Sequence, residues 1–287
     1  MQEIAQLLIN GVVSGTILAV PAIGLTAIYA VLRFPNFSIA SHATVGAFAG
    51  YIANATLALP APAAVLVGFG AAGLVGVASD QLALRPLRPS GALTSAIASV
   101  ALMIALENLL RFGFGNDLRG FDLPIMRDWR LGGLRVGPQQ LENLGMAIVA
   151  MAALFLFLSF TRTGKAMRAV ADNPALADVK GIDPEQMARL ASFIGMGLAG
   201  AGGVLLGLDT SIDPLTGFRA ILSIFAAAVV GGLGSIPGAV VGALTVGIAE
   251  ELSLIAIAPA YRTAVGFGAI LIVLTVRPRG LLGERAY

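Results

Sequence analysis

Long apolar runs occupy most of the chain and constrain its fold more than any other feature. They extend over about 17–25 residues, the length at which an α-helix crosses the hydrocarbon core of a bilayer. Strands of a membrane β-barrel would instead alternate apolar and polar residues over about 10 positions. Charged residues make up only 12% of the 287 residues, against about 25% in soluble domains. The sequence therefore predicts an all-α, polytopic bundle that lies in a lipid bilayer as one transmembrane domain over residues 1–287, with no attached soluble domain.

The apolar runs divide into nine predicted spans, within a range of eight to ten. Pro21 and Gly24 favour a break in the first span, and the run at 217–232 is short enough for a half-helix. No Lys or Arg precedes the first run, so we expect a retained helix rather than a cleaved signal peptide. The spans are placed at residues 6–32, 38–58, 61–82, 92–112, 141–160, 188–208, 217–232, 236–257 and 261–277.

Lys and Arg in short loops predict the orientation of such a bundle, because cytoplasmic loops carry most of them. The basic loops are residues 85–88, the polar segment 161–190 and the tail 276–287. Segment 115–138 offsets its arginines with acids and resembles a short external hairpin. With nine spans, this distribution places the N-terminus outside and the C-terminus in the cytoplasm.

The polar segment 161–190 has the pattern of short capped helices. Ser, Thr, Asp and Asn favour the cap before a helix, Pro its first position, and Gly the position after its end. The predicted caps are Thr163 for a first helix, Asn173 followed by Pro174 for a second that stops at Gly181, and Asp183 followed by Pro184 and Gln186 for a third.

The second of these helices is predicted to be a rigid element outside the membrane. Leu176 and Val179 lie three residues apart and therefore share one face. A short helix that is fixed by a turn at each end is suited to docking into a groove of another protein. The alternative is an ordinary loop with good capping.

Five stretches of the sequence, taken together, form a pattern that is more specific than any one of them alone. TRTGKAMRAVADNPALADVKGI at 161–182 is followed by LAGAGGVLLG at 198–207, AAVVGGLGSIPGAVVGALTVGIAEE at 227–251 and VRPRGLLG at 276–283. NFSIASHATVGAF begins at Asn36. Together they resemble permeases of ATP-binding cassette (ABC) importers for branched-chain amino acids, with the first stretch in the place of the coupling region. The likeness covers nearly the whole chain.

The resemblance implies a transporter made of several chains in the inner (plasma) membrane of a bacterium. This chain would form a heterodimer with a second permease subunit. Two cytoplasmic ATP-binding subunits and an extracytoplasmic substrate-binding protein would complete the assembly. The coupling helix, seated in a cleft of an ATPase, would be formed by Asn173, Pro174, Leu176, Ala177, Val179 and Gly181.

Two departures from the family pattern leave the substrate open. The Glu-Ala-Ala-x-x-x-Gly pattern of permeases falls on residues 175–181 without its Glu. The family's His-Gly pair falls on residues 39–40, and the single histidine, His42, comes later. Branched-chain or other small hydrophobic amino acids are the first expectation. Urea, short amides or small carboxylates, moved by a permease of the same type, are the alternative.

Polar groups and glycines within the spans are candidates for lining the transport pathway. Polar groups are costly in lipid, and a helix broken at glycines is tolerated in the membrane where it borders a cavity. Glu107 lies four residues before Arg111, which equally predicts a structural pair. Gly231–Gly238 fits a connection between spans, a bend beside the pathway or tight glycine packing. For His42, the alternative to lining the pathway is a hydrogen-bonded role within its helix. The residues assigned to the pathway are Asn36, His42, Glu107, Gly232 and Gly234.

Acidic residues near the predicted outer surface are candidates for docking the binding protein. Asp209 and Asp213 flank a turn, and Glu250 lies near the end of a helix. Turn formation at Asp213-Pro214 and interfacial anchoring by Glu250 are the simpler alternatives.

The sequence lacks the patterns of enzyme chemistry. With no Cys and a single His there is no His-based metal cluster, and we expect no metal, cofactor or nucleic-acid partner. Around Gly164-Lys165, a phosphate-binding loop would need a Gly where Ser159 stands and a Ser or Thr where Ala166 stands. ATP would therefore be hydrolysed by other subunits. A stand-alone secondary carrier is the rival class, and the few mid-span acids count against it; an intramembrane enzyme is the third.

Overall fold

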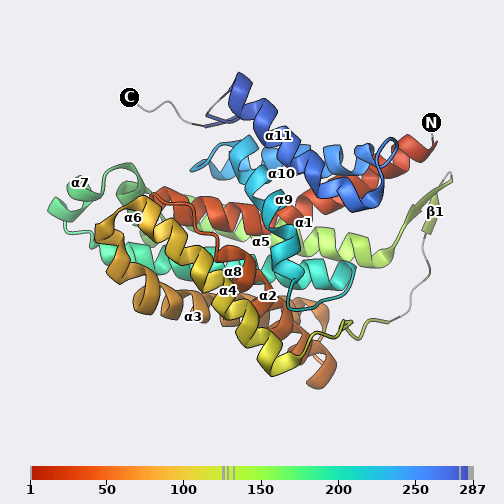
Figure 1. Ribbon diagram of the computed structural model, residues 1–287, viewed down its shortest axis with the longest axis horizontal. Coiled ribbons are helices and arrows are strands. Elements are labelled where there is room, and N and C mark those ends of the chain that lie inside the picture. The colour runs from red at the N-terminus through yellow and green to blue at the C-terminus, as the bar shows by residue number, and fades with distance from the viewer. Residues whose placement is uncertain (1, 125–126, 128, 132, 278, 284–287) are drawn as a thin grey trace.

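A bundle of α-helices is the architecture of the computed structural model, which describes residues 2–124, 127, 129–131, 133–277 and 279–283. Figure 1 shows several long helices lying along the long axis of the molecule. The α-helices are α1 (Gln2–Leu32), α2 (Ile39–Tyr51), α3 (Ala61–Ser79), α4 (Ala92–Phe114), α5 (Pro138–Phe160), α6 (Arg162–Asp172), α7 (Pro174–Val179), α8 (Pro184–Asp209), α9 (Thr216–Gly231), α10 (Ile236–Ser253) and α11 (Arg262–Val276).

Short elements extend or connect these helices. Two strands, β1 (Trp129–Leu131) and β2 (Leu134–Val136), form an antiparallel hairpin in which Trp129 lies opposite Val136. The hairpin predicted within segment 115–138 is therefore present. The remaining elements are the π-helices η1 (Ile52–Thr56) and η2 (Asp80–Leu84) and the 3-10 helices η3 (Arg85–Ser90) and η4 (Pro259–Tyr261).

In the described part of the chain, six helices are long and apolar enough to cross a membrane. They are α1, α3 with its extension to Ser90, α4, α5, α8 and α10, and α9 and α11 are shorter apolar helices. Each of the predicted spans contains a helix, the second being α2 continued by η1. The prediction of an all-helical polytopic bundle is confirmed at this level.

The predicted break in the first span is wrong, because α1 is one helix that contains both Pro21 and Gly24. Both residues are buried against neighbouring helices. A Cβ added to Gly202 of α8 would lie 2.5 Å from Cδ of Pro21, so this glycine leaves room for the proline ring. Membrane helices tolerate an internal proline where neighbouring helices pack closely around it.

The centre of the bundle is formed by α1 and α8, with α1 packed along α10 and α8, and α8 along α2 and α3. Small residues allow these helices to approach closely. A Cβ on Gly15 of α1 would lie 2.8 Å from the carbonyl oxygen of Ala243 on α10, and a Cβ on Gly203 of α8 would overlap the carbonyl of Ala43 on α2. By contrast, α4 and α5 are largely exposed along their length.

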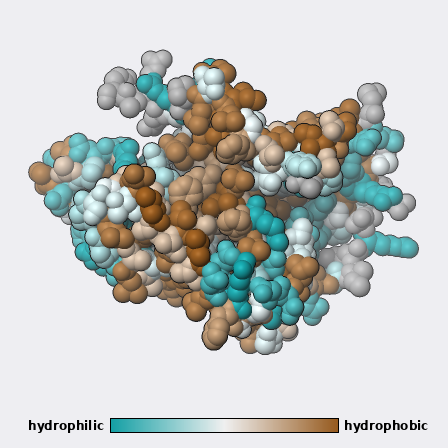
Figure 2. Space-filling model, viewed as in Figure 1, coloured by the Kyte–Doolittle hydropathy of each residue, from teal (hydrophilic) through white to brown (hydrophobic). Residues whose placement is uncertain are grey.

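Polar elements lie at the two ends of the bundle. In Figure 1, α6 and α7 project at the left end, and the hairpin lies at the right end beside the start of α1. Figure 2 shows hydrophobic residues over the middle of the same face, and hydrophilic ones toward its left end, over α6 and α7, and over its lower right.

Candidate functional site

The predicted coupling region begins with α6, whose cap differs from the prediction. Thr161 caps this helix: its Oγ1 accepts a hydrogen bond of 2.9 Å from the backbone N–H of Gly164. Thr163 was expected in this role and instead lies within the first turn, so that prediction is wrong. The chain turns from α5 into α6 at Thr161 itself, where the backbone is extended (φ −83°, ψ 152°).

The short helix α7 has the caps that the sequence predicts. Oδ1 of Asn173 accepts a hydrogen bond of 3.0 Å from the backbone N–H of Leu176. Gly181 ends the helix with φ of +82°, a conformation that suits glycine. Asp183 then caps α8 by accepting hydrogen bonds from the backbone N–H groups of Glu185 and Gln186 at 2.8 and 3.3 Å.

α7 carries an exposed apolar face. The side chains of Leu176 and Val179 are 57% and 83% exposed, whereas Ala177 is 4% exposed and fastens the helix to the protein. Asn173, Pro174 and Gly181 are exposed beside them. The helix therefore presents two apolar side chains outward from a backbone that is fixed at both ends.

A cluster of charges joins the start of α8 to the segment after α3. Nε of Arg85 lies 2.8 Å from Oε1 of Glu185, and Arg88 contacts the same carboxylate at 3.7 Å. Arg88 also forms an ion pair with the buried carboxylate of Asp80. The sequence indicated these arginines only as markers of a cytoplasmic loop, because their acidic partners lie in other elements.

Asn36, in the connection between α1 and α2, and His42, in the first turns of α2, are both buried. Both side chains contact Ser38: Oδ1 of Asn36 accepts hydrogen bonds from its backbone N–H (3.1 Å) and hydroxyl (2.7 Å). Nδ1 of His42 lies 2.7 Å from its carbonyl oxygen. These contacts fit the hydrogen-bonded role that was the alternative for the histidine, and a pathway role for either residue stays a prediction.

The remaining pathway candidates occupy two separate places. Glu107 and Arg111 form the predicted pair on α4, with 2.8 Å between Oε1 and a guanidinium nitrogen. Gly232 and Gly234, with φ of +107° and +95°, form the connection between α9 and α10. The backbone at residues 230–231 accepts hydrogen bonds from the tail at residues 281–282. The glycine run is thus a tightly packed connection between two helices, and lining of the pathway by these residues is a prediction still.

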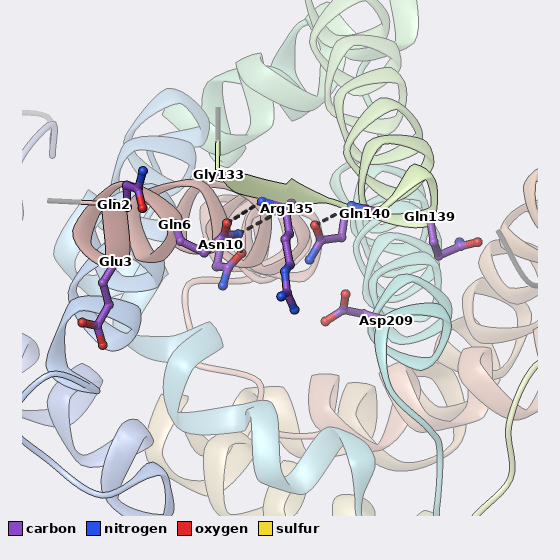
Figure 3. A pocket seen from close by; sticks show the side chains of 10 residues that line it. Gln2, Glu3, Gln6, Asn10, Gly133, Arg135, Gln139, Gln140 and Asp209 are labelled. Carbon is purple, nitrogen blue, oxygen red and sulfur yellow. Dashed lines mark hydrogen bonds between the residues drawn. The ribbon is translucent and has the colours of Figure 1, made fainter. Parts of the chain in front are cut away.

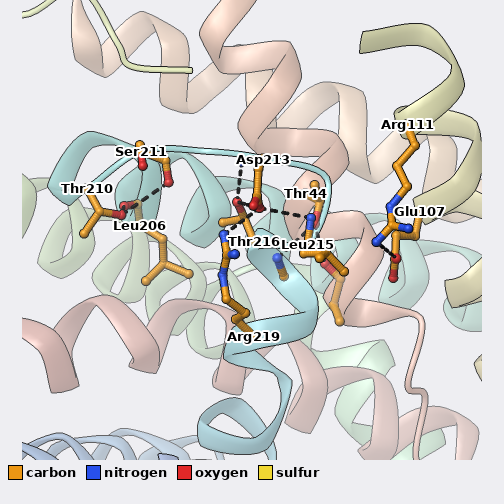
Figure 4. Close-up of polar contacts among 12 residues, drawn as sticks. Thr44, Glu107, Arg111, Leu206, Thr210, Ser211, Asp213, Leu215, Thr216 and Arg219 are labelled. Carbon is orange, nitrogen blue, oxygen red and sulfur yellow. Dashed lines mark hydrogen bonds and ion pairs between the residues drawn. The ribbon is translucent and has the colours of Figure 1, made fainter. Parts of the chain in front are cut away.

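Asp213 organises the turn that precedes α9. Its carboxylate accepts hydrogen bonds from the backbone N–H of Leu215 (3.0 Å) and the hydroxyl of Thr216 (3.1 Å), and it pairs with Arg219 at 2.5 Å. Figure 4 shows this network, with the pair on α4 standing apart from it. The turn chemistry predicted at this position is present, and Asp213 itself is buried.

Glu250 lies inside the bundle rather than at an interface. It is 3% exposed, accepts a hydrogen bond of 2.6 Å from the hydroxyl of Ser223, and lies 3.6 Å from Nε of Arg262. The adjacent Glu251 is also buried and pairs with the same arginine at 2.7 Å. This burial does not suit interfacial anchoring, and a role of Glu250 in docking the binding protein stays a prediction. The cluster was not predicted, because Arg262 was read as the start of the last span.

Asp209 is exposed at the end of α8 and lines a polar pocket of about 570 Å³. Figure 3 shows the pocket between the start of α1, strand β2, the start of α5 and the end of α8. Within the described residues, no group of three or more His, Cys, Asp or Glu side chains is arranged to hold a metal ion.

Membrane-length helices packed through glycines, with a capped helix projecting from one end, define a polytopic membrane protein. The family of the branched-chain amino acid transport system permease component matches residues 7–275. The high-affinity branched-chain amino acid transport system permease protein LivH of Escherichia coli is 33% identical, over 97% of this chain and 95% of its own length. The corresponding protein BraD of Pseudomonas aeruginosa is 32% identical, over 97% and 95%.

The chain therefore belongs to the branched-chain amino acid transport permease family. It is the multi-pass permease component of an ABC transport system, without a catalytic role of its own, and such a component implies partner ATPase subunits. Among solved structures, PsaBC from Streptococcus pneumoniae in complex with Fab aligns with a TM-score of 0.49 at 14% identity, over 97% of this chain and 93% of that chain.

Proposed function

We propose that this chain and a second, different permease subunit form the transmembrane pathway of an importer for branched-chain or other small hydrophobic amino acids. Two ATPases on the cytoplasmic side drive the transport, and an extracytoplasmic binding protein delivers the substrate. The family supports the substrate class. The exposed, doubly capped helix α7 is the observation that carries the coupling role.

α7 is the contact with an ATPase in this proposal. Exposed apolar side chains on a fixed helix bind well in a groove, because the helix loses little freedom on binding. Leu176 and Val179 provide these side chains, and Ala177 holds the helix against the rest of the chain. Closure of the ATPases on ATP moves their clefts, and α7 moves with them.

The movement of α7 reaches the membrane through stiff connections on both sides of it. Asp183 caps α8 directly after α7, and Glu185 in the first turn is paired with Arg85 in the segment after α3. On the other side, Arg33 at the end of α1 donates a hydrogen bond to the carbonyl of Ala171 in α6. Displacement of α7 therefore shifts the central helices α1 and α8 together, which is what switching a pathway between two states requires.

The proposal places the N-terminus outside and the C-terminus in the cytoplasm, with α2, α9 and α11 crossing the membrane together with the longer helices. The support is the distribution of basic residues, because the loops at 85–88 and 161–190 carry them. The α6–α7 segment and the hairpin lie at opposite ends of the bundle, as this orientation needs (Figure 1).

The coupling role is tested by replacing both exposed apolar residues of α7, Leu176→Asp with Val179→Asp, and measuring leucine uptake by the assembled transporter. We expect uptake to fall by about tenfold or more, because burying two carboxylates in an apolar cleft is costly. Co-purification of the ATPases should fall with it, while membrane insertion is unchanged. Asp178→Asn, an exposed change on the same helix, is the matched control. Normal uptake by the double variant would rule out the coupling role.

A further inference from the structure

The pocket at the hairpin end of the bundle has an unusual lining for a membrane protein. Its described lining residues are glycines or carry amide or charged side chains, and none is apolar. Its volume of about 570 Å³ lies within the range of small-molecule sites, about 300–1,000 Å³. An apolar solute has little to contact here, whereas a small charged solute has many partners.

Three charged residues line this space: Glu3 at the start of α1, and two of opposite sign on other elements, Arg135 and Asp209. Figure 3 shows Arg135 reaching in from strand β2 and Asp209 from the end of α8, with their charged groups turned toward each other. In the described part of the chain, neither residue takes part in an ion pair. Glu251 and Arg262, whose charges act on Asp209 from the side of α10 and α11, are paired with each other at 2.7 Å.

The backbone of Arg135 is held in place by α1. The side chain of Gln6 donates a hydrogen bond of 2.9 Å to the carbonyl of Arg135 and accepts one of 2.8 Å from its backbone N–H. This reciprocal contact fixes strand β2 over the start of α1. At the other side of the pocket, the amide oxygen of Gln140 accepts a hydrogen bond of 3.3 Å from Gly137. The frame of the pocket is thus formed without using the guanidinium of Arg135 or the carboxylate of Asp209.

We propose that this pocket is an entry site that binds the α-carboxylate and α-ammonium groups of an arriving amino acid. Arg135 pairs with the carboxylate, for which a guanidinium offers two parallel donors, and Asp209 accepts hydrogen bonds from the ammonium. The inference rests on the proposed function, which supplies amino acids as the substrate. Because the lining is polar, the site recognises the groups that all amino acids share, and selection of an apolar side chain occurs elsewhere.

The test measures binding of radiolabelled leucine to the permease complex in nanodiscs, with the partner subunits present and the binding protein absent. We expect Arg135→Gln and Asp209→Asn each to weaken binding by about tenfold or more, because each removes one charge-assisted contact. Leucinamide, which lacks the carboxylate, and 4-methyl-2-oxopentanoate, which lacks the ammonium, should compete poorly. Alanine should compete nearly as well as leucine.

Matched controls are Arg127→Gln and Asp117→Asn, exposed residues of the same outer segment that do not line the pocket. Both should bind leucine as the wild type does, and Arg135→Lys should restore part of the affinity that Arg135→Gln loses. Unchanged leucine binding in Arg135→Gln and Asp209→Asn would overturn the entry site.

The entry site and the proposed function fail in distinguishable ways. A wild-type complex that imports leucine from its binding protein but binds none in this assay leaves the proposed function standing and overturns the entry site. A wild-type complex that neither binds nor imports leucine overturns the proposed function, and the entry site with it.

Discussion

At the scale of single residues, two threonines at the start of α6 have different roles despite their proximity. Thr161 accepts the capping hydrogen bond from Gly164, and Thr163 lies within the first turn. We expect Thr161→Ala to destabilise the protein by about 1 kcal/mol, the usual cost of losing such a cap. Thr163→Ala should stay within about 0.5 kcal/mol of the wild type. Thermal unfolding of both variants in detergent checks this, and equal midpoints would contradict the assignment of the cap.

Two glycines test the packing of the bundle at the same scale. A Cβ on Gly203 would overlap the carbonyl of Ala43, whereas a Cβ on Gly70 of α3 would meet nothing within 4 Å. We expect Gly203→Ala to cost about 1–3 kcal/mol, since the backbones of α2 and α8 must separate. Gly70→Ala should be neutral or slightly stabilising, because alanine favours a helix. The yield and the thermal stability of the purified variants are the measurements, and a stable Gly203→Ala would show that the helices separate at little cost.

At the scale of elements, the ion pairs of Glu185 connect the start of α8, directly after α7, to the segment after α3. We expect Glu185→Gln to leave the ATPases bound while lowering the amino acid transported per ATP hydrolysed severalfold, because α8 then moves without the segment that carries Arg85 and Arg88. Lys165→Gln, an exposed change on α6, should have no effect. Transport and ATP hydrolysis measured in the same proteoliposomes give this ratio, and an unchanged ratio would remove these pairs from the coupling route.

How far sequence predicts an element depends on whether its determinants are local. The caps of α7 are local, since Asn173 and Gly181 bond within a few residues, and they were predicted correctly. Pro21 misled the prediction because the residue that accommodates its ring, Gly202, belongs to a distant helix. The N-cap of α6 was predicted at Thr163 because Thr161, two positions earlier, is an equally good cap residue. The residue at which α5 ends, Phe160, determines that Thr161 is the cap.

At the scale of the whole molecule, the polar sites depend on contacts between distant parts of the chain. Gln6 reaches Arg135 across 129 positions, and Ser14 lies within hydrogen-bonding distance of Glu251 across 237. Periodicity and motifs carry no information about such pairs, so the sequence identified Glu250 as an acidic residue near one end without its partners Ser223 and Arg262. Composition and hydropathy sufficed for the bundle itself, because lipid imposes helices on any long apolar run.

The orientation of the molecule can be tested cleanly, because the chain has no cysteine of its own. Asp117 and Val179 are exposed at the hairpin end and on α7. A charged maleimide does not cross the inner membrane, so it should label Asp117→Cys in cells with a permeable outer membrane. Val179→Cys should be labelled only after the inner membrane is opened, and association with the ATPases should then protect it. Labelling of Val179→Cys in intact cells would invert the topology and place α7 where no ATPase can reach it.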